Sequence, residues 1–204
     1  MNDPVDRRRR GLLLGLATLP VAGLAAMKPT PSGTEGPFYP LPAMRFADVD
    51  NDLVKIDGMV EQSGGEIVRI GGRVLDTAGQ PLAGARVEIW QCDANGRYLH
   101  SGDRGGAARD GGFQGFGFDV ASAQGEYSFR TIKPVPYPGR TPHIHVKVVA
   151  GGRERLTSQF YLADHPDNQR DWLYRHIAPE LRERVTLTFE TSGAVPEARL
   201  DIIV

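Results

Sequence analysis

The chain has 204 residues, a formal net charge of −1 and one cysteine, Cys92. The length suits a single globular domain, and the near-zero charge argues against nucleic acid as a partner, because phosphate binding needs a concentrated positive face. One cysteine excludes an intramolecular disulfide and argues against a thiolate zinc site.

The first 25 residues have the pattern of an export signal. Residues 7–10 are four arginines, residues 11–17 are apolar, and small residues follow up to Ala25. Arg9 and Arg10, followed by a spacer and two leucines, are similar to a twin-arginine signal. We expect cleavage after Ala25 and a periplasmic or extracellular protein without a stable membrane span, since the apolar run falls short of about 20 residues. The alternative is an uncleaved N-terminal anchor.

Residues 26–65 show little periodicity and predict an irregular arm, whereas short strands are predicted throughout residues 66–204. Apolar residues alternate from Glu66 onward, and Asn95-Gly96 predicts a hairpin turn before a glycine-rich loop over about 101–117. One late helical stretch is expected over about 168–183, broken or restarted at Pro179. The sequence therefore predicts a mainly β protein, a single β-sandwich domain. The strands are expected from residue 66, over 85–89, 127–132, 143–149 and 158–161, and over 185–189.

Two histidines, His143 and His145, lie two residues apart in one predicted strand. Because side chains alternate along a strand, both imidazoles project from the same face and can chelate a metal. The pair alone is equally compatible with two hydrogen-bonded surface histidines. A cupin is disfavoured, because its pattern needs a glycine where this chain has Tyr137 and a glutamate where Val149 and Ala150 stand. The His-Glu-x-x-His pattern of zinc hydrolases is also missing from the sequence.

Several runs around the histidine pair together resemble the intradiol ring-cleavage dioxygenases, and their motifs are closest to the iron-bearing β subunits of the protocatechuate 3,4-dioxygenase branch. The resemblance spans about residues 34–165. No single run is specific, but the combination is. The matching runs are residues 36–39, 87–91, 96–98, 125–138 and 156–161, together with Arg140 and residues 143–145.

This resemblance implies a non-haem Fe(III) enzyme with one iron per chain, which cleaves a catechol with O2 between its hydroxylated carbons to a cis,cis-muconate. Phenolate is a hard anionic donor suited to Fe(III), and two phenolates offset much of the ion's charge. Arg140 is implied to stabilise charge that develops on the ring, with Gln159 supporting it. Tyr39 and His100 are weaker candidates for substrate contacts. The implied iron ligands are Tyr98, Tyr137, His143 and His145.

The loop between Tyr137 and His143 is shorter than in protocatechuate dioxygenases. The resemblance therefore does not determine which catechol is the substrate. A carboxylated ring would need a cation at the pocket wall, for which Arg97, Arg130 and Lys133 are candidates. Relatives in the family form dimers or mixed assemblies, so a homodimer or a mixed oligomer is implied.

A second reading comes from residues 72–76 and 84–87, which also resemble transthyretin-like β-sandwich modules. Such an exported module would bind a ligand without catalysis and would be colourless. A tyrosinate-bound ferric enzyme would be burgundy. A third reading keeps the fold and the iron but lacks efficient turnover.

Overall fold

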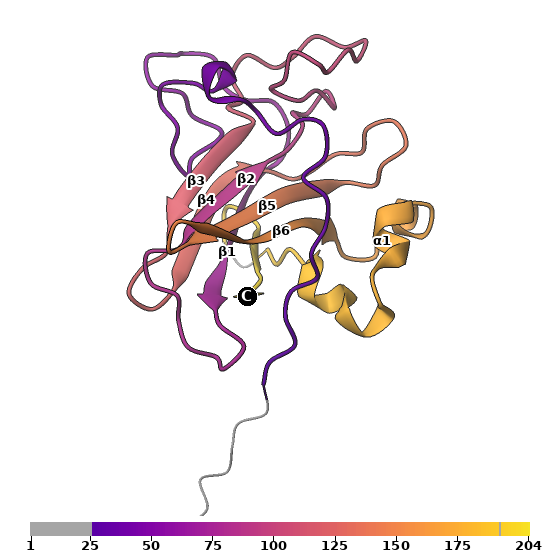
Figure 1. The fold of residues 1–204 in the computed structure, drawn as a ribbon. Coiled ribbons are helices and arrows are strands. Elements are labelled where there is room, and N and C mark those ends of the chain that lie inside the picture. The colour runs from indigo at the N-terminus through magenta and orange to yellow at the C-terminus, as the bar shows by residue number, and fades with distance from the viewer. Residues whose placement is uncertain (1–25, 192) are drawn as a thin grey trace, which may run out of the picture.

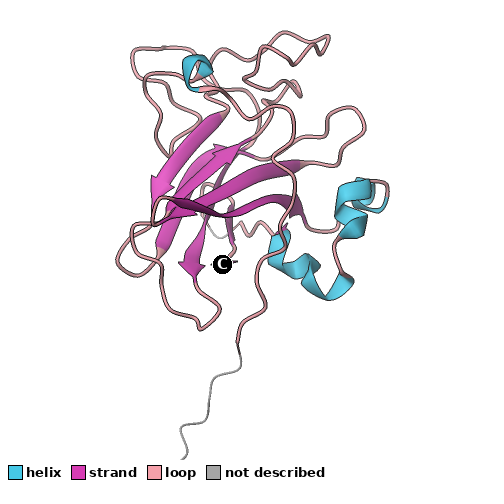
Figure 2. Ribbon diagram, in the orientation of Figure 1, coloured by secondary structure: helices cyan, strands magenta, loops and turns pink. Residues whose placement is uncertain are grey.

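Two β-sheets packed face to face form the body of the molecule (Figures 1 and 2). A computed structural model describes residues 26–191 and 193–204, so the predicted export signal, residues 1–25, lies outside the described residues. The arrangement confirms the predicted β-sandwich.

The first sheet is built around β1 (Ile67–Leu75). This strand pairs antiparallel with β4 (Glu126–Ile132) along one edge. Along its other edge it pairs in parallel with two short strands, β8 (Glu197–Arg199) and β9 (Ile202–Ile203). Both short strands lie more than 100 residues from β1 in the sequence and were not predicted.

The second sheet has five strands in the order β3-β2-β5-β6-β7. Neighbours in the first four strands pair antiparallel, whereas β7 pairs in parallel with β6. The strands are β2 (Arg86–Trp90), β3 (Phe116–Val120), β5 (His143–Ala150), β6 (Arg153–Leu162) and β7 (Thr186–Leu187).

The segment between β2 and β3 differs from the prediction. Asn95 and Gly96 do form a turn, with Gly96 at φ 74°, but no strand follows it and the turn does not make a hairpin. Carboxylates organise this segment instead: Asp93 accepts hydrogen bonds from the backbone amides of Asn95 and Arg97. The strand that pairs with β2 begins only at Phe116, at the end of the predicted glycine-rich loop.

The late helical stretch is divided into three short pieces rather than one. They are η2 (Pro166–Gln169), α1 (Trp172–His176) and η3 (Pro179–Val185). Pro179 does restart the helix, because its fixed φ suits a first turn. No helix in the described part of the chain is long and apolar enough to cross a membrane.

The core lies between the sheets and contains every second residue of the central strands. Ile89 of β2 lies opposite Val146 of β5, and Ile144 of β5 lies opposite Phe160 of β6. All four side chains are buried in one apolar cluster. The alternate residues of these strands therefore point away from the core, to the outer face of the second sheet.

The arm covers this outer face (indigo in Figure 1). Its first part crosses β6, where the amide of Gly33 donates to the carbonyl of Thr157 and the hydroxyl of Ser158 donates to the carbonyl of Pro31. After a short helical turn, η1 (Pro42–Met44), the arm also reaches the core, where Leu53 is fully buried. The arm is irregular as predicted, but it is an integral layer of the domain.

The close approach of the C-terminal segment to β1 gives a stability prediction. A Cβ atom built on Gly72 would lie 2.0 Å from the carbonyl oxygen of Leu200, so Gly72→Ala must displace backbone. We expect a loss of about 1–3 kcal/mol in the free energy of unfolding, measured by denaturant titration. The control is Gly106→Ala, since a Cβ at Gly106 meets no atom within 4 Å. Equal stability of the two variants would contradict the close approach.

Candidate metal centre

The outer face of β5 presents two buried imidazoles side by side. His143 and His145 are 1% and 3% exposed, and their Nε2 atoms lie 3.2 Å apart. Two nitrogens that each lie about 2.1 Å from a shared ion are roughly 3.0–3.4 Å apart. The spacing of the pair therefore suits chelation of one ion.

Two tyrosines from loops complete the cluster. The hydroxyl oxygen of Tyr98, which is 2% exposed, lies 3.5 Å from Nε2 of His143. The ring of Tyr137 meets that of Tyr98 edge-on at 5.4 Å and that of His143 at 5.5 Å. Asp103 positions Tyr98 by accepting a hydrogen bond from its backbone amide at 2.6 Å. The structure thus brings together all four residues predicted as iron ligands.

The hydrogen bonding of His143 leaves its second nitrogen free to coordinate. Its Nδ1 lies 2.7 Å from the carbonyl oxygen of Thr141, and because a carbonyl only accepts, Nδ1 must carry the proton. In the neutral ring, Nε2 then presents a lone pair to the cluster. Burial, with Arg140 nearby, lowers the pKa of His143 to about 4, so the ring is neutral at pH 7.

His145 is oriented by packing. Its ring stacks on Trp90 of β2 at 4.7 Å with an interplanar angle of 12°, and Gly36 of the arm lies against its Cε1 atom. Gly36 has φ 74°, and a Cβ there would be only 3.2 Å from Cε1, which favours glycine. The buried Nδ1 atom of His145 has no hydrogen-bond partner among the described residues.

The donor set fits a metal ion. Burial lowers the pKa of His145 well below its ordinary value and raises that of Tyr98 well above it, so without a cation both side chains are neutral. Neutral nitrogen lone pairs and phenol oxygens gathered out of water suit a metal ion, whose positive charge would favour the phenolate form of the tyrosines. Nowhere in the described residues do three histidine, cysteine, aspartate or glutamate side chains gather as a metal site.

Arg140 lies beside the cluster with its guanidinium in fixed contacts. Its Nε donates to Asp171 at 2.7 Å, its Nη2 donates to Gln159 at 2.6 Å, and its Nη1 faces the hydroxyl of Tyr137 at 3.4 Å. Gln159 lies opposite His145 in the neighbouring strand β6. Arg140 and Gln159 were predicted from the sequence, whereas Asp171, which lies 31 residues from Arg140, was not.

The two weaker candidates, Tyr39 and His100, are each separated from the cluster by one aromatic side chain. Tyr39 packs edge-on against Trp90 at 4.9 Å, and its hydroxyl donates to Glu88 at 2.7 Å. His100 lies 5.8 Å from Phe38, whose ring is 5.0 Å from that of Tyr98. Neither contact brings the side chain to the four donors directly.

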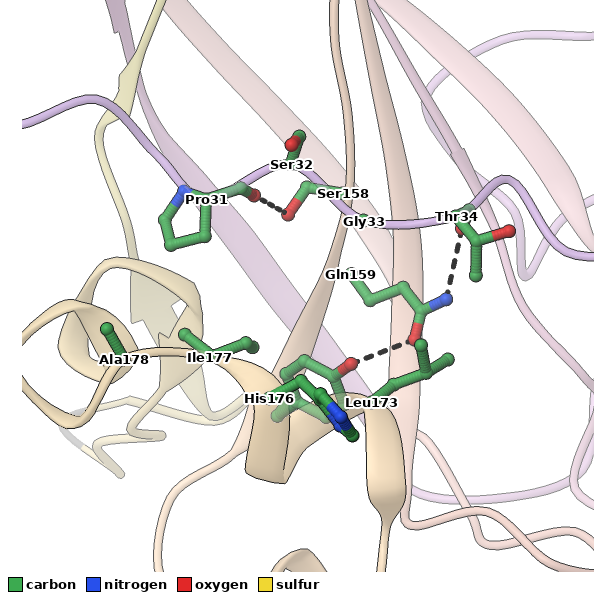
Figure 3. Close-up of a pocket in the computed structure, with 11 residues that line it drawn as sticks. Pro31, Ser32, Gly33, Thr34, Ser158, Gln159, Leu173, His176, Ile177 and Ala178 are labelled. Carbon is green, nitrogen blue, oxygen red and sulfur yellow. Dashed lines mark hydrogen bonds between the residues drawn. The ribbon is translucent and has the colours of Figure 1, made fainter.

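Two cavities adjoin the residues around the cluster. One, of about 330 Å³, lies between the arm and α1, and Figure 3 shows Gln159 at its edge with the amide nitrogen directed at the carbonyl of Thr34. The other, of about 300 Å³, is lined by Tyr137 and Arg140. The second cavity gives a small molecule access to both of those side chains.

The three cations considered for a substrate carboxylate all have partners. Arg97 donates to carbonyl oxygens of the 103–107 loop, Arg130 pairs with Asp52 at 3.0 Å, and Lys133 pairs with Glu66 at 3.2 Å. None of them lines the cavity beside Tyr137.

Comparison with known proteins places the chain in a family. A family model described as "Dioxygenase" matches residues 34–203. The chain is 35% identical over 149 residues to the protocatechuate 3,4-dioxygenase beta chain of Burkholderia cepacia, covering 69% of this chain and 63% of that one. It is 30% identical to catechol 1,2-dioxygenase of Candida albicans, covering 83% of this chain and 61% of that one. The chain thus spans under two thirds of these relatives.

Solved structures show the same fold. The dioxygenase domain of a carbohydrate-binding fusion protein from Streptomyces sp. SirexAA-E has a TM-score of 0.64 at 31% identity and covers 87% of this chain and 98% of that chain. An intradiol ring-cleavage dioxygenase from Tetranychus urticae has a TM-score of 0.67 at 22% identity and covers 86% of this chain and 94% of that chain.

The position of Tyr39 gives a prediction that separates stability from metal binding. Tyr39→Phe removes a donor to the buried carboxylate of Glu88, so we expect the free energy of unfolding to fall by about 1–2 kcal/mol. Metal content should stay at the wild-type level, because the hydroxyl points away from the four donors. Denaturant titration and elemental analysis measure the two quantities. Loss of metal with unchanged stability would instead make Tyr39 part of the centre.

Proposed function

The chain belongs to the intradiol dioxygenase family, and from that premise we propose that it is a mononuclear ferric dioxygenase of catechols. One observation carries this proposal: two phenols and two imidazoles converge beside a fixed guanidinium, with the imidazole Nε2 atoms 3.2 Å apart. The proposed iron ligands are Tyr98, Tyr137, His143 and His145, with one Fe(III) per chain.

The proposed reaction joins catechol and O2 to give a cis,cis-muconate, with the ring opened between its hydroxylated carbons. Ferric iron would supply the attachment point for the catechol oxygens and withdraw electron density from the ring. The protein's own groups would handle protons and charge. Tyr137, half-buried and next to the cavity, would be a phenolate when bound to iron, and that phenolate oxygen would accept a catechol proton.

Arg140 is the proposed catalytic cation. Its Nη1 already faces the Tyr137 hydroxyl, so it lies where negative charge would develop on a ring bound there. A preorganised donor of this kind is typically worth about 2.7–4 kcal/mol of transition-state stabilisation. Gln159 would hold the guanidinium in place through its Nη2 atom.

We propose a ring without a carboxylate as the preferred substrate. Arg97, Arg130 and Lys133 each have other partners, and burying a carboxylate without a cation is costly. Arg170, the other cation at the cavity beside Tyr137, is 87% exposed, which weakens any ion pair it makes. The relatives include proteins named for catechol, for hydroxyquinol and for protocatechuate.

The experiment is to purify the protein without added metal, measure its iron, and assay catechol and protocatechuate side by side with product identification. We expect close to one iron per chain, a visible tyrosinate band, a muconate product and faster turnover of catechol. Tyr98→Phe should shift or bleach the band, and His145→Ala should lose iron and activity together.

Three outcomes would contradict the proposal. Stoichiometric zinc or copper without a tyrosinate band would contradict the ferric assignment. A colourless, metal-free protein that binds an aromatic ligand without turnover would favour the binding-module alternative. Coloured, iron-loaded protein that fails to turn over any catechol would leave only the fold and the metal.

We also propose that residues 1–25 direct export, by the twin-arginine route, with the mature protein beginning near Ala26. A route that carries folded protein would let the metal bind before transport. Replacing Arg9 and Arg10 by lysine should block both export and N-terminal processing, which fractionation and N-terminal sequencing would detect. Unchanged processing and location in this variant would contradict the twin-arginine route.

A further inference from the structure

Asp171 is a fully buried carboxylate that accepts four hydrogen bonds. Its side chain is 0% exposed. Oδ2 accepts from Nε of Arg140 at 2.7 Å and from the backbone amide of Thr141 at 3.0 Å. Oδ1 accepts from the amides of Leu173 and Tyr174 at 3.0 and 3.1 Å, which caps α1. One side chain thus joins the loop that precedes the histidine strand to the start of α1.

Helix capping alone does not explain a charged residue at this position. A cap needs only an oxygen acceptor, and serine, threonine or asparagine supply one without burying a charge. An unpaired buried carboxylate is costly, whereas one matched to a guanidinium with all its acceptor sites filled is not. Burial alone would raise the pKa of Asp171, but hydrogen bonds from Arg140 and from the backbone amides of Tyr174 and Thr141 hold that pKa below its ordinary value. The negative charge is therefore matched to Arg140.

The guanidinium is held at two of its three nitrogens. Asp171 accepts a hydrogen bond from Nε, and Oε1 of Gln159 accepts one from Nη2 at 2.6 Å. Gln159 is itself fixed, because its Oε1 accepts from the Tyr161 hydroxyl and its Nε2 donates to the carbonyl of Thr34 (Figure 3). A guanidinium is planar and rigid, so fixing two nitrogens also fixes the third. Nη1 is left facing Tyr137 at 3.4 Å.

We propose that Asp171 is a positioning residue, which aims Nη1 of Arg140 at the substrate ring during catalysis. This inference rests on the proposed function, since it assumes that Arg140 stabilises charge in the reaction. None of the hydrogen bonds of the Asp171 carboxylate reaches one of the four donor side chains, so we infer that it acts through Arg140. Its removal should therefore change the rate of the chemical step, with metal and substrate binding retained.

The first test is Asp171→Asn, which keeps an oxygen to cap α1 and removes the charge that faces Arg140. We expect kcat to fall about 10- to 100-fold, the effect typical of losing an outer partner of a functional group. Iron content, the visible band and its shift on adding catechol should match wild type, and KM should change little. The matched control is Asp164→Asn, which removes an exposed carboxylate from the same region and should keep wild-type kcat.

The deciding measurement is a double-mutant cycle with Arg140→Ala. If Asp171 acts through Arg140, adding Asp171→Asn to Arg140→Ala causes no further loss of kcat. A purely structural role would lower kcat by the same factor in both backgrounds. Wild-type kcat in Asp171→Asn, or independent effects in the cycle, would overturn the positioning role. Thermal melting of each variant, and of Asp171→Ser as a second variant that keeps a capping oxygen, separates unfolding from loss of rate.

These outcomes are distinguishable from failure of the proposed function. If the wild-type protein lacks iron or does not oxidise catechols, the proposed function fails at that step, before any Asp171 variant is compared. If the wild-type enzyme is active and only the cycle is additive, the ferric dioxygenase stands and the role of Asp171 is structural.

Discussion

In β5, Ile144 and Val146 face the core while His143 and His145 face outward, so one strand builds both the sandwich and the centre. Because side chains alternate, a shift of one residue would drive both imidazoles into the apolar core. Pairing on both sides prevents this: Trp90 of β2 and Gln159 of β6 lie directly opposite His145. The irregularity in the β5–β6 pairing falls only at Val148 and Val149, beyond the histidines. The apolar packing of the sandwich therefore also sets the 3.2 Å separation of the two Nε2 atoms.

The candidate centre also depends on the exclusion of water from this outer face of the second sheet. One face of an antiparallel sheet in a sandwich commonly meets solvent. Here the arm crosses it, with Gly33 bonded to β6 and Gly36 against the ring of His145. Burial by the arm and the loops is the main cause of the lowered histidine pKa values and the raised pKa of Tyr98. Burial therefore keeps both imidazoles neutral, with nitrogen lone pairs available to a metal ion.

The parts of the candidate centre that follow local rules were predictable from the sequence. The histidine pair follows from strand alternation, and the family motifs carried Tyr98, Tyr137, Arg140 and Gln159, which the structure does bring together. The central strands were also predicted, because their apolar residues alternate. The elements that were not predicted depend on contacts between residues that lie far apart in the sequence. β8 and β9 are two or three residues long and exist only because β1 pairs with them.

Asp171 was not predicted for the same reason, because its role depends on a contact that is distant in the sequence. Asp171 lies in a segment predicted as helix interior, whereas it caps α1 and contacts a loop 31 residues earlier in the chain. Nothing in its neighbouring residues distinguishes it from Asp164 or Asp167. Only the tertiary arrangement shows that its carboxylate is buried and that its partner is Arg140. The predicted hairpin at Asn95-Gly96 was wrong for a related reason, since the strand that pairs with β2 lies beyond the loop.

The pairing of the arm with β9 also bears on how quickly the chain folds. Thr30 and Ile203 exchange two hydrogen bonds across a sequence separation of 173 residues, and Ile203 also lies in register with Leu75 of β1. Contacts of such long range must be closed against chain entropy before they contribute stability, so topologies rich in them fold slowly. During synthesis, the strand with both histidines emerges well before β9 does. A nascent chain of that length already carries both imidazoles but lacks one of the anchors of the arm that shields them, so the shielding of this face is completed late in folding.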